Sequence, residues 1–521
     1  MHQTIALSAA AARHSRSATG LVLVLGTVVA LLGSWNASLW TDEAVTVSAA
    51  SRSLRELWDL TGHIDAVHAA YYTLMNVWVD AFGASSFALR LPSAFALGIA
   101  AAGTYRLGML LAGPRVGVLA ACIMVLLPRS TWMGMEARSF VFGAAVAVWL
   151  TYLLAATLRG RPPSSTPAVV AAWGGYAILA GLGIALNLYV ALVLCAHGVS
   201  ILLVGAPWRQ RFLWLGSALA GVAMASPIVR LSLAQSGQVS ENELGPAAWL
   251  RNVVVNQWFL GATPTGGVSP DFPSLLWKAA SVVLAVFCWS LILWFSASVL
   301  RGQVDRGGTE VLMWAGSLIV VPTFTIVAFS TLGDPLYNPR YLAFATPGVA
   351  LIVGAALARI RGAGRRAVIT GLIALLALPV YLSQRTGDAK SGADWAEAAA
   401  FVGRAAEAGD AVYFAPRVPG ASPVIEQTMR RLSVAYPRPF EGLDDVTLLT
   451  SGNQDASIDG TSTHLDESLA KLDGERRLWA VEHLNYPEGA SAEDAEFLAS
   501  IGFTQRVQWH GTLTRVTLFD R

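Results

Sequence analysis

Long apolar segments alternate with short polar ones over the first three quarters of the chain. A transmembrane helix needs about 20 mostly apolar residues, and the pattern predicts about eleven such spans. They cover residues 18–36, 87–105, 115–128, 138–158, 168–185, 187–205, 212–233, 275–300, 310–331, 342–358 and 367–383. We interpret the first as a retained span rather than a cleaved leader, because no convincing small-residue cleavage site follows it.

Basic residues are distributed unevenly between the loops that join these spans. Lysine and arginine are enriched in cytoplasmic loops, so the bias predicts orientation. With the N-terminus in the cytoplasm, every inner loop is basic, through Arg106, Arg115, Arg159, Arg161, Arg209, Arg211, Arg301, Arg306, Arg359, Arg361, Arg365 and Arg366. We therefore expect a multi-pass plasma-membrane protein whose outer loops are residues 37–86, 129–137, 234–274 and 332–341.

The pattern changes near residue 385, where shorter helix and strand signals replace the spans. Residues 390–416, KSGADWAEAAAFVGRAAEAGDAVYFAP, predict an amphipathic helix, a turn and a strand. The alternation continues in SPVIEQTMRRL, RRLWAVEHL and AEDAEFLASIGF, and TQRVQWHGTLTRVTLFDR predicts a closing hairpin. Such alternation is typical of a small α/β domain. We expect an α-helical polytopic membrane domain over residues 1–385 and a soluble extracytoplasmic α/β domain over residues 386–521.

Composition supports a membrane protein. The 521 residues are 54% hydrophobic and 13% charged, about half the roughly 25% charge of soluble domains, and the mean hydropathy is +0.52. A net charge of +2 gives no reason to expect a nucleic-acid partner. Cys122, Cys195 and Cys288 lie inside apolar runs, so they predict neither a disulfide nor a metal site.

Two adjacent carboxylates, Asp42 and Glu43, follow the first span in the stretch WTDEA. A charge at the membrane centre costs about 2.5–3.5 kcal/mol, and less near the interface, so charges kept there usually have a partner or a function. A simpler explanation is a helix cap, with Thr41 or Asp42 capping the helix that follows. Amphipathic stretches around residues 54–60 and 71–79 predict further helices lying along the membrane surface.

Other polar groups fall on the same predicted side. The first loop carries Asp65 and His68, and the later outer segments carry Arg138 and Arg340. Arginine suits phosphate, because its planar fork donates two parallel hydrogen bonds. Simpler roles are open for each: an ion pair for Asp65, a hydrogen bond within the loop for His68, and contact with lipid headgroups for the arginines. Arg90, at the start of the second span, is expected to contact headgroups.

The outer loop from Gln235 to Trp277 is rich in glycine and proline, so it predicts irregular structure. We expect it to roof the site and to help choose the acceptor. Asn256, Gln257 and Trp258 are candidates for contacts with sugar. Asn187 and Tyr189, near the outer end of a span, are weaker candidates.

The ordered set WTDEA, HIDAVHAAYYTLMNVW, ALRLPSAFALGIAAAGTYRLG, MEARSF and NPRYLAFATPGVALIVGAAL resembles the GT-C superfamily of membrane glycosyltransferases. The likeness covers residues 18–385 and is strongest to the branch of protein O-mannosyltransferases and lipid A aminoarabinose transferases. Residues 65–72, DAVHAAYY, keep the histidine but lack the prolines of a His-Pro-Pro element found in much of that branch. The resemblance implies a polyprenyl-phosphate-sugar donor, an extracytoplasmic active site, inversion at the anomeric carbon, and Asp42 as catalytic base.

These expectations combine into one reaction: transfer of mannose or another monosaccharide to a hydroxyl of a glycan, glycolipid or protein. Asp42 would accept the proton and Glu43 would orient it or hold the acceptor, while Arg138, Arg340 and His68 would bind the donor phosphate. Contacts with sugar or acceptor are assigned to Asp65, Tyr71, Tyr337, Asn338 and Trp258. No cofactor is expected to be required; Asp42, Glu43, Asp65 and His68 could ligate a divalent metal, but no ligand motif is strong.

Two other classes remain open at this point. A transporter or flippase of a lipid-linked sugar would place charged or helix-breaking residues midway through its spans, often in repeated halves. The charges here gather on one side, and the sequence has no visible repeat. A non-catalytic scaffold would use the outer domain to bind a partner, although about eleven spans exceed what anchoring requires.

Overall fold

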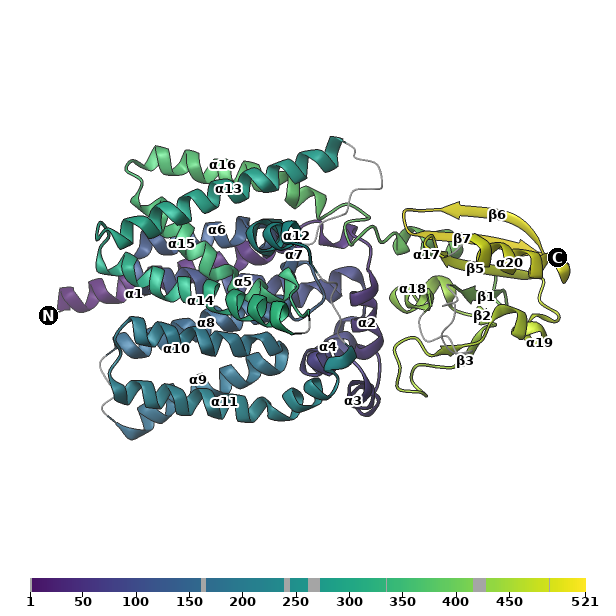
Figure 1. Cartoon of the computed structure of the whole chain (residues 1–521), viewed down its shortest axis with the longest axis horizontal. Helices are drawn as coiled ribbons and strands as arrows, with labels where there is room; N and C mark the ends of the chain where they lie inside the picture. The colour runs from purple at the N-terminus through teal and green to yellow at the C-terminus, as the bar shows by residue number, and fades with distance from the viewer. Residues whose placement is uncertain are drawn as a thin grey trace.

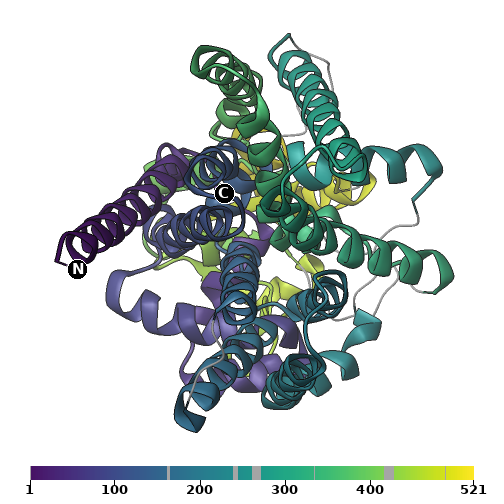
Figure 2. The same cartoon turned by 90° about the vertical axis from the view of Figure 1, so that its left-hand side faces the viewer.

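The computed structural model describes residues 2–160, 165–238, 244–260, 272–333, 335–415, 428–486 and 488–521. Within these ranges long helices lie side by side in one bundle, and a small sheet domain lies beyond one end of it (Figure 1). Figure 2 views the bundle from its other end, where the chain begins, so many of the long helices are seen nearly end-on. The two-part architecture predicted from the hydrophobic pattern is confirmed.

The bundle consists of apolar helices joined by short loops. They are α1 His2–Leu31, α5 Ser86–Ala112, α6 Pro114–Leu126, α8 Phe140–Arg159, α9 Thr166–Leu186, α10 Ala191–Leu203, α11 Trp208–Ala234, α13 Phe272–Leu300, α14 Arg306–Leu332, α15 Thr346–Arg359 and α16 Ala363–Ser383. By length and composition, nine helices of the described residues can cross a membrane. A bent pair, α6 with α7 (Pro128–Gly134), can make a tenth span.

The predicted count of about eleven spans is therefore slightly too high. The helix predicted over 187–205 is an apolar helix of Leu188–Leu203, too short to count as a span. The prediction counted apolar residues, which do not reveal where a helix is interrupted. The backbone is extended at Asn187, and this residue ends α9 and begins the turn that leads into α10. The α6–α7 bend of 64° follows from Pro128, because Leu127 before it is extended and proline lacks the N–H that would continue the helix.

Three shorter helices cover the end of the bundle that faces the sheet domain (Figure 1). They are α2 Thr41–Ala50, α3 Leu54–His63 and α4 Ala69–Phe82. Helix α3 begins with a capping box, in which the Ser53 hydroxyl accepts from the Glu56 N–H and the Glu56 carboxylate accepts from the Ser53 N–H. The amphipathic stretches of the first outer loop are thus helices, as predicted.

The C-terminal domain is built on a five-stranded sheet of order β2-β1-β5-β7-β6. Its elements are α17 Trp395–Ala405, β1 Ala411–Phe414, α18 Arg430–Ala435, β2 Asp444–Asp445, β3 Leu448–Thr450, β4 Thr461–Ser462, α19 Leu469–Leu472, β5 Arg477–His483, α20 Glu488–Ser500, β6 Thr504–His510 and β7 Thr514–Asp520. Strand β1 pairs in parallel with β2 and β5, and β7 pairs antiparallel with β5 and β6. The helix predicted in SPVIEQTMRRL is described only from Thr428 onward, because residues 416–427 lie outside the described ranges.

Alternate residues of the central strand β5 serve two different cores. Leu478 and Ala480 pack toward α20 in a core confined to the domain. Trp479 and Val481 pack into a second core with α17, which continues into α2, α3 and α4. Because side chains alternate between the faces of a strand, one face of the sheet is covered by the membrane part of the chain. The predicted boundary at residues 385 and 386 falls just after the end of α16 and stays a prediction.

Polar contacts join the same two parts of the chain. Arg52, buried between α2 and α3, donates to the backbone oxygens of Gly452 (3.0 Å) and Ser457 (2.5 Å) in the C-terminal domain. The Tyr436 hydroxyl accepts a hydrogen bond of 2.7 Å from the Leu39 N–H, two residues before α2 begins at Thr41. The C-terminal domain therefore holds the segment that leads into α2.

Replacing Arg52 should destabilise the whole protein. In Arg52→Gln, two partly buried carbonyls lose a charged donor, and a hydrogen bond to a charged group is worth about 1.5–3 kcal/mol. We expect a clearly lower unfolding temperature in detergent, measured by intrinsic fluorescence. Arg55→Gln, three residues away on an exposed position of α3, is the matched control and should leave the unfolding temperature unchanged. Equal unfolding temperatures for the two variants would contradict a role for the Arg52 contacts.

Candidate active site

A cavity of about 320 Å³ opens at the end of the bundle that faces the sheet domain. Its lining consists of Asp42, Asp65, Val67, His68, Arg138, Ser139, Phe140, Asn187, Leu188, Tyr189, Gln238, Arg340 and Tyr341. Five of the ten predicted site residues meet here: Asp42, Asp65, His68, Arg138 and Arg340. They come from the first outer loop, the segment before α8 and the turn before α15, so only the folded chain brings them together.

Asp42 lies in the first turn of α2 and turns its side chain into the cavity. The N-cap position is taken by Trp40, whose carbonyl accepts from the Ala44 N–H at 2.8 Å. Among the described residues no side chain caps this helix, so the capping role considered for Thr41 or Asp42 is wrong. The Asp42 carboxylate, 20% exposed, instead lies 2.9 Å from Arg340 Nη1 and 4.0 Å from Arg138 Nε.

Arg340 is held in position by its own turn. The side chain of Asn338 accepts from the Arg340 N–H at 3.2 Å, at the start of the 3₁₀ turn Pro339–Ala345. Its guanidinium lies 5.4 Å from the centre of the Tyr341 ring, which stacks at 5.1 Å on Tyr189. Arg340 therefore faces a carboxylate and an aromatic wall rather than lipid headgroups, so the headgroup alternative is wrong.

Arg138 and Asp65 are joined through a tyrosine. The Tyr72 hydroxyl donates to the Asp65 carboxylate and accepts from Arg138 Nη1 at 2.6 Å, and Arg138 Nη1 lies 3.7 Å from Asp65. Asp65 has a positive φ of 62°, an unusual conformation that aspartate tolerates better than most residues. Burial raises the pKa of Asp65, but the charge of Arg138 and the hydrogen bond from Tyr72 contribute to a net lowering of that pKa.

His68 adds a polar group without a charge near neutral pH. Burial, followed by repulsion from Arg138, lowers its pKa to about 4. Its Nδ1 lies 3.5 Å from the Ser139 hydroxyl, at the outer limit of a hydrogen bond. A contact of His68 with phosphate would thus be a hydrogen bond from a neutral ring, not an ion pair.

Glu43, the second carboxylate of WTDEA, points away from the cavity. Its side chain is 0% exposed, and its Oε1 accepts from Arg90 Nε at 2.8 Å and from the Ala137 N–H at 3.0 Å. Burial raises the pKa of Glu43, but the charge of Arg90 more than offsets this and the net pKa is lowered. Glu43 is buried and does not line the cavity, so the structure does not support its predicted role in holding the acceptor. Arg90 is likewise not at the lipid headgroups.

A second buried carboxylate, Glu136, has a similar arrangement. It forms an ion pair with Lys390, a residue of the C-terminal segment, and accepts from the Trp40 indole at 2.7 Å. Burial raises its pKa. Glu136 therefore links the residue before α2 to the start of the C-terminal domain, and Trp40 is fixed in place.

Four further predicted contact residues lie away from the cavity lining. Tyr71 is buried against Phe142, with ring centres 5.7 Å apart. Trp258 is buried in a π-helix, Asn252–Leu260, and the Tyr337 hydroxyl donates to Gln257 Oε1 at 2.8 Å. Their predicted roles in sugar or acceptor binding are not supported by this geometry, and Asn338 acts as the cap of Arg340.

Tyr72 is the main residue that the sequence reasoning missed. It follows His68 by four residues, and positions four apart share one face of a helix; the two ring centres are 5.7 Å apart. That spacing favours Tyr72 over Tyr71 as the partner of His68. Arg129, a basic residue of the same outer segment as Arg138 and therefore also a candidate anion binder, does not line the cavity: its Nε donates to the Gln257 carbonyl at 3.1 Å and so braces the π-helix.

The loop from Gln235 to Trp277 touches the site where it is described. The Gln235 side chain accepts from the Ala66 N–H and donates to the Thr61 carbonyl, both at 2.9 Å, and Gln238 lines the cavity. Residues 239–243 and 261–271 lie outside the described ranges, so the predicted roof stays a prediction.

The described residues bring together no group of three or more His, Cys, Asp or Glu side chains that could hold a metal ion. The prediction that no metal is required is not tested by this observation.

The bundle and the cavity at its end define a polytopic membrane protein whose fold is similar to that of GT-C glycosyltransferases. No protein-family model matches the sequence, and no curated protein matches it. Among solved structures, ArnT from Cupriavidus metallidurans in the apo state aligns with a TM-score of 0.59 and 13% identity, over 96% of this chain and 98% of that chain. ArnT bound to undecaprenyl phosphate aligns with a TM-score of 0.54 and 12% identity, over 96% and 97%.

A more distant similarity is to an oligosaccharyltransferase from Archaeoglobus fulgidus in the apo form, with a TM-score of 0.48 and 14% identity over 95% of this chain and 74% of that chain. At these identities the likeness to ArnT establishes the fold.

The two adjacent carboxylates should respond differently to removal of charge. Glu43→Gln leaves Arg90 buried without its counter-charge, and breaking a buried pair in this way costs about 3–5 kcal/mol. Asp42→Asn changes a partly exposed group and should leave the folded state close to the wild type. Size-exclusion profiles and unfolding temperatures in detergent measure both. A Glu43→Gln variant as stable as Asp42→Asn would contradict the structural role of Glu43.

The depressed pKa of His68 predicts a pH dependence of stability. Its ordinary value is near 6.5 and its folded value about 4, so between these values the unfolded chain binds more protons and stability falls as the pH falls. The unfolding temperature of the wild type should drop between pH 7 and pH 5 by more than that of His68→Gln. Parallel pH profiles would show that His68 is not held neutral.

Proposed function

We propose that this protein transfers a sugar from a polyprenyl-phosphate-linked donor to a hydroxyl of an acceptor, with inversion at the anomeric carbon. The observation that carries the proposal is the placement of one carboxylate, Asp42, beside two guanidiniums, Arg138 and Arg340, in a cavity at the outer end of the bundle. The reaction needs a base that removes the proton of the acceptor hydroxyl, and it needs cations that stabilise the departing lipid phosphate.

The acceptor hydroxyl is a weak acid, so it has to lose its proton as it attacks. Asp42 accepts that proton from the hydroxyl, which must approach within about 2.6–3.2 Å. The new bond forms between the acceptor oxygen and the anomeric carbon, while the bond from that carbon to the phosphate oxygen breaks. The electron pair of the broken bond stays on the lipid phosphate, which leaves as a monoester.

The arginines serve the leaving group. Negative charge grows on the phosphate as the bond breaks, and donors already aimed at that position stabilise it. Arg340 and Arg138 are largely buried cations, and both line the cavity next to Asp42. His68 adds a neutral hydrogen-bonding group, and Asp65 with Tyr72 keeps the Arg138 fork in place.

Arg340 also pairs with Asp42 itself. A donor phosphate that binds Arg340 and Arg138 would replace the carboxylate as the partner of these arginines. The Asp42 side chain is then available to contact the acceptor hydroxyl.

The fold supports the choice of donor. ArnT, the solved structure to which this chain is similar over 96% of its length, has been seen with undecaprenyl phosphate bound. We propose a lipid donor of the same kind here, with mannose or another monosaccharide as the sugar and a cell-envelope glycan, glycolipid or protein as the acceptor. We propose that the cavity and the C-terminal domain lie outside the plasma membrane and the N-terminus in the cytoplasm, because lysine and arginine are enriched in cytoplasmic loops.

Asp42→Asn should abolish transfer by purified protein. Loss of a general base typically lowers the rate by about 10²–10⁴-fold, and the substitution keeps the shape of the side chain. Release of polyprenyl phosphate from a panel of synthetic polyprenyl-phosphate sugars, in detergent, measures the rate. Detergent abolishes compartments, so transfer by the wild type also excludes a pure transporter. A near wild-type rate for Asp42→Asn would refute Asp42 as the base.

Arg340→Ala should weaken use of the donor more than use of the acceptor. The lost guanidinium contacts the phosphate in our scheme, and one charged hydrogen bond is worth about 1.5–3 kcal/mol, or a rise in donor KM of about tenfold or more. Steady-state kinetics with each substrate varied in turn separate the two effects. Arg251→Ala, at an exposed position of the outer segment Pro246–Arg251, serves as control. An unchanged donor KM would contradict the assignment.

A further inference from the structure

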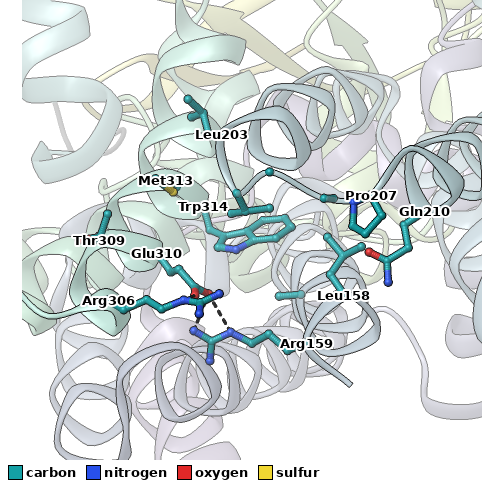
Figure 3. Close-up of a pocket in the computed structure, with 14 residues that line it drawn as sticks. Leu158, Arg159, Leu203, Pro207, Gln210, Arg306, Thr309, Glu310, Met313 and Trp314 are labelled. Atoms are coloured by element: carbon teal, nitrogen blue, oxygen red, sulfur yellow. Dashed lines mark hydrogen bonds and ion pairs between the residues drawn. The ribbon is translucent and has the colours of Figure 1, made fainter. Parts of the chain in front are cut away.

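Another cavity of about 320 Å³ lies at the opposite end of the bundle, remote from Asp42 and from the sheet domain (Figure 3). It lies where α8 ends, where α10 turns into α11 and where α14 begins. The reaction proposed above makes no use of this end. The cavity is therefore a separate feature that needs its own explanation.

The cavity exists because one helix is short. At 1.5 Å per residue, the apolar helix Leu188–Leu203 is about 24 Å long, against a hydrocarbon thickness of about 30 Å. It ends in a tight turn: Gly205 has a φ of +68°, and the Ala206 N–H donates back to the Ile201 carbonyl at 3.1 Å. The cavity lies beside this turn, between the end of α8 and the start of α14.

One side of the cavity is charged (Figure 3). Glu310 accepts from Arg159 Nε at 2.8 Å and from Arg306 Nε at 3.1 Å. Arg159 also donates to the carbonyls of Leu110 and Leu111 at the end of α5, so its donors are occupied. The Arg306 side chain is 93% exposed, and it forms an ion pair with Glu310 four residues further along α14.

The charges do not cancel. Two guanidiniums face one carboxylate, so the lining carries a net charge of +1. The Gln210 amide, at the opposite side of the mouth in Figure 3, is a further polar group. The charge and the exposed Arg306 together favour an anion over a neutral or cationic ligand.

The rest of the wall is apolar. Trp314, buried at the back of the cavity, packs edge-on against the His197 ring at 6.1 Å, and Leu158, Leu203 and Met313 lie around it. A cationic rim next to an apolar wall matches an anionic membrane lipid, whose phosphate lies at the interface and whose acyl chains run into the bilayer. A free anion would leave the apolar wall without a partner.

We propose that this cavity binds an anionic phospholipid from the leaflet at this end of the bundle, which the arginine bias of the loops identifies as the cytoplasmic one. Its phosphate accepts hydrogen bonds from the Arg306 guanidinium and the Gln210 amide. An acyl chain lies against Trp314, Leu203 and Met313 and fills the space below the short helix. Arg159 and Glu310 hold Arg306 at the rim.

The test uses the full-length protein in lipid nanodiscs that contain phosphatidylglycerol or phosphatidylcholine, followed by native mass spectrometry of the retained lipid. The wild type should retain phosphatidylglycerol in preference to phosphatidylcholine. Arg306→Gln should weaken retention of phosphatidylglycerol by about tenfold, the effect of one charged hydrogen bond. Because Arg306 is exposed, the variant should fold, and its intact mass peak reports that directly.

Arg365→Gln is the matched control, since it removes an exposed arginine near the start of α16, at the same end of the bundle. It should retain phosphatidylglycerol like the wild type. Equal retention by Arg306→Gln and Arg365→Gln would overturn the site, as would a wild type that shows no preference between the two lipids. Displacement of the lipid by millimolar inorganic phosphate would overturn the lipid assignment, because the acyl chain would then contribute nothing; retention supports it.

Discussion

The buried ion pair between Glu43 and Arg90 is the contact on which the outer site depends. It ties the first turn of α2 to α5. Arg90 also donates to the carbonyls of Ala37 (2.7 Å) and Ser38 (3.0 Å), which lie just before α2. Successive residues of a helix differ by about 100° in direction. With Glu43 turned into the core, Asp42 has to turn away from it, and the cavity is where it points. One carboxylate of WTDEA is paired in the core, and the other lines the cavity.

The C-terminal domain contributes to the same positioning. Its sheet shares a core with α2, α3 and α4, Arg52 and Tyr436 connect the backbones of the two parts, and Lys390 supplies the counter-charge of Glu136. Removing residues 390–521 would therefore expose a core as well as remove a surface. Loss of activity in such a truncation would not distinguish a scaffold from an enzyme, whereas single substitutions at Asp42 and Arg340 do.

The two ends of the bundle use arginine in different ways. At the end that faces the sheet domain, Arg138 and Arg340 face carboxylates in a cavity, and in the reaction we propose these arginines bind a phosphate. At the other end, Arg159 is fully occupied by Glu310 and by carbonyls of α5, and the Arg306 side chain is exposed; in our second proposal Arg306 binds a lipid phosphate.

The sequence by itself determined the architecture. Long apolar runs indicate the membrane spans, and the alternation of short helix and strand patterns indicates the small α/β domain. It also indicated Asp42, Asp65, His68, Arg138 and Arg340. A polar or charged side chain close to the hydrocarbon of the membrane costs free energy, so residues of this kind are conspicuous in the sequence. It could not assign Glu43, Tyr71 or Arg90, because the direction of each side chain depends on which neighbour is buried beside it. Only the tertiary structure decided those partners: Arg90 lies 47 positions from Glu43, and Arg340 lies 298 positions from Asp42.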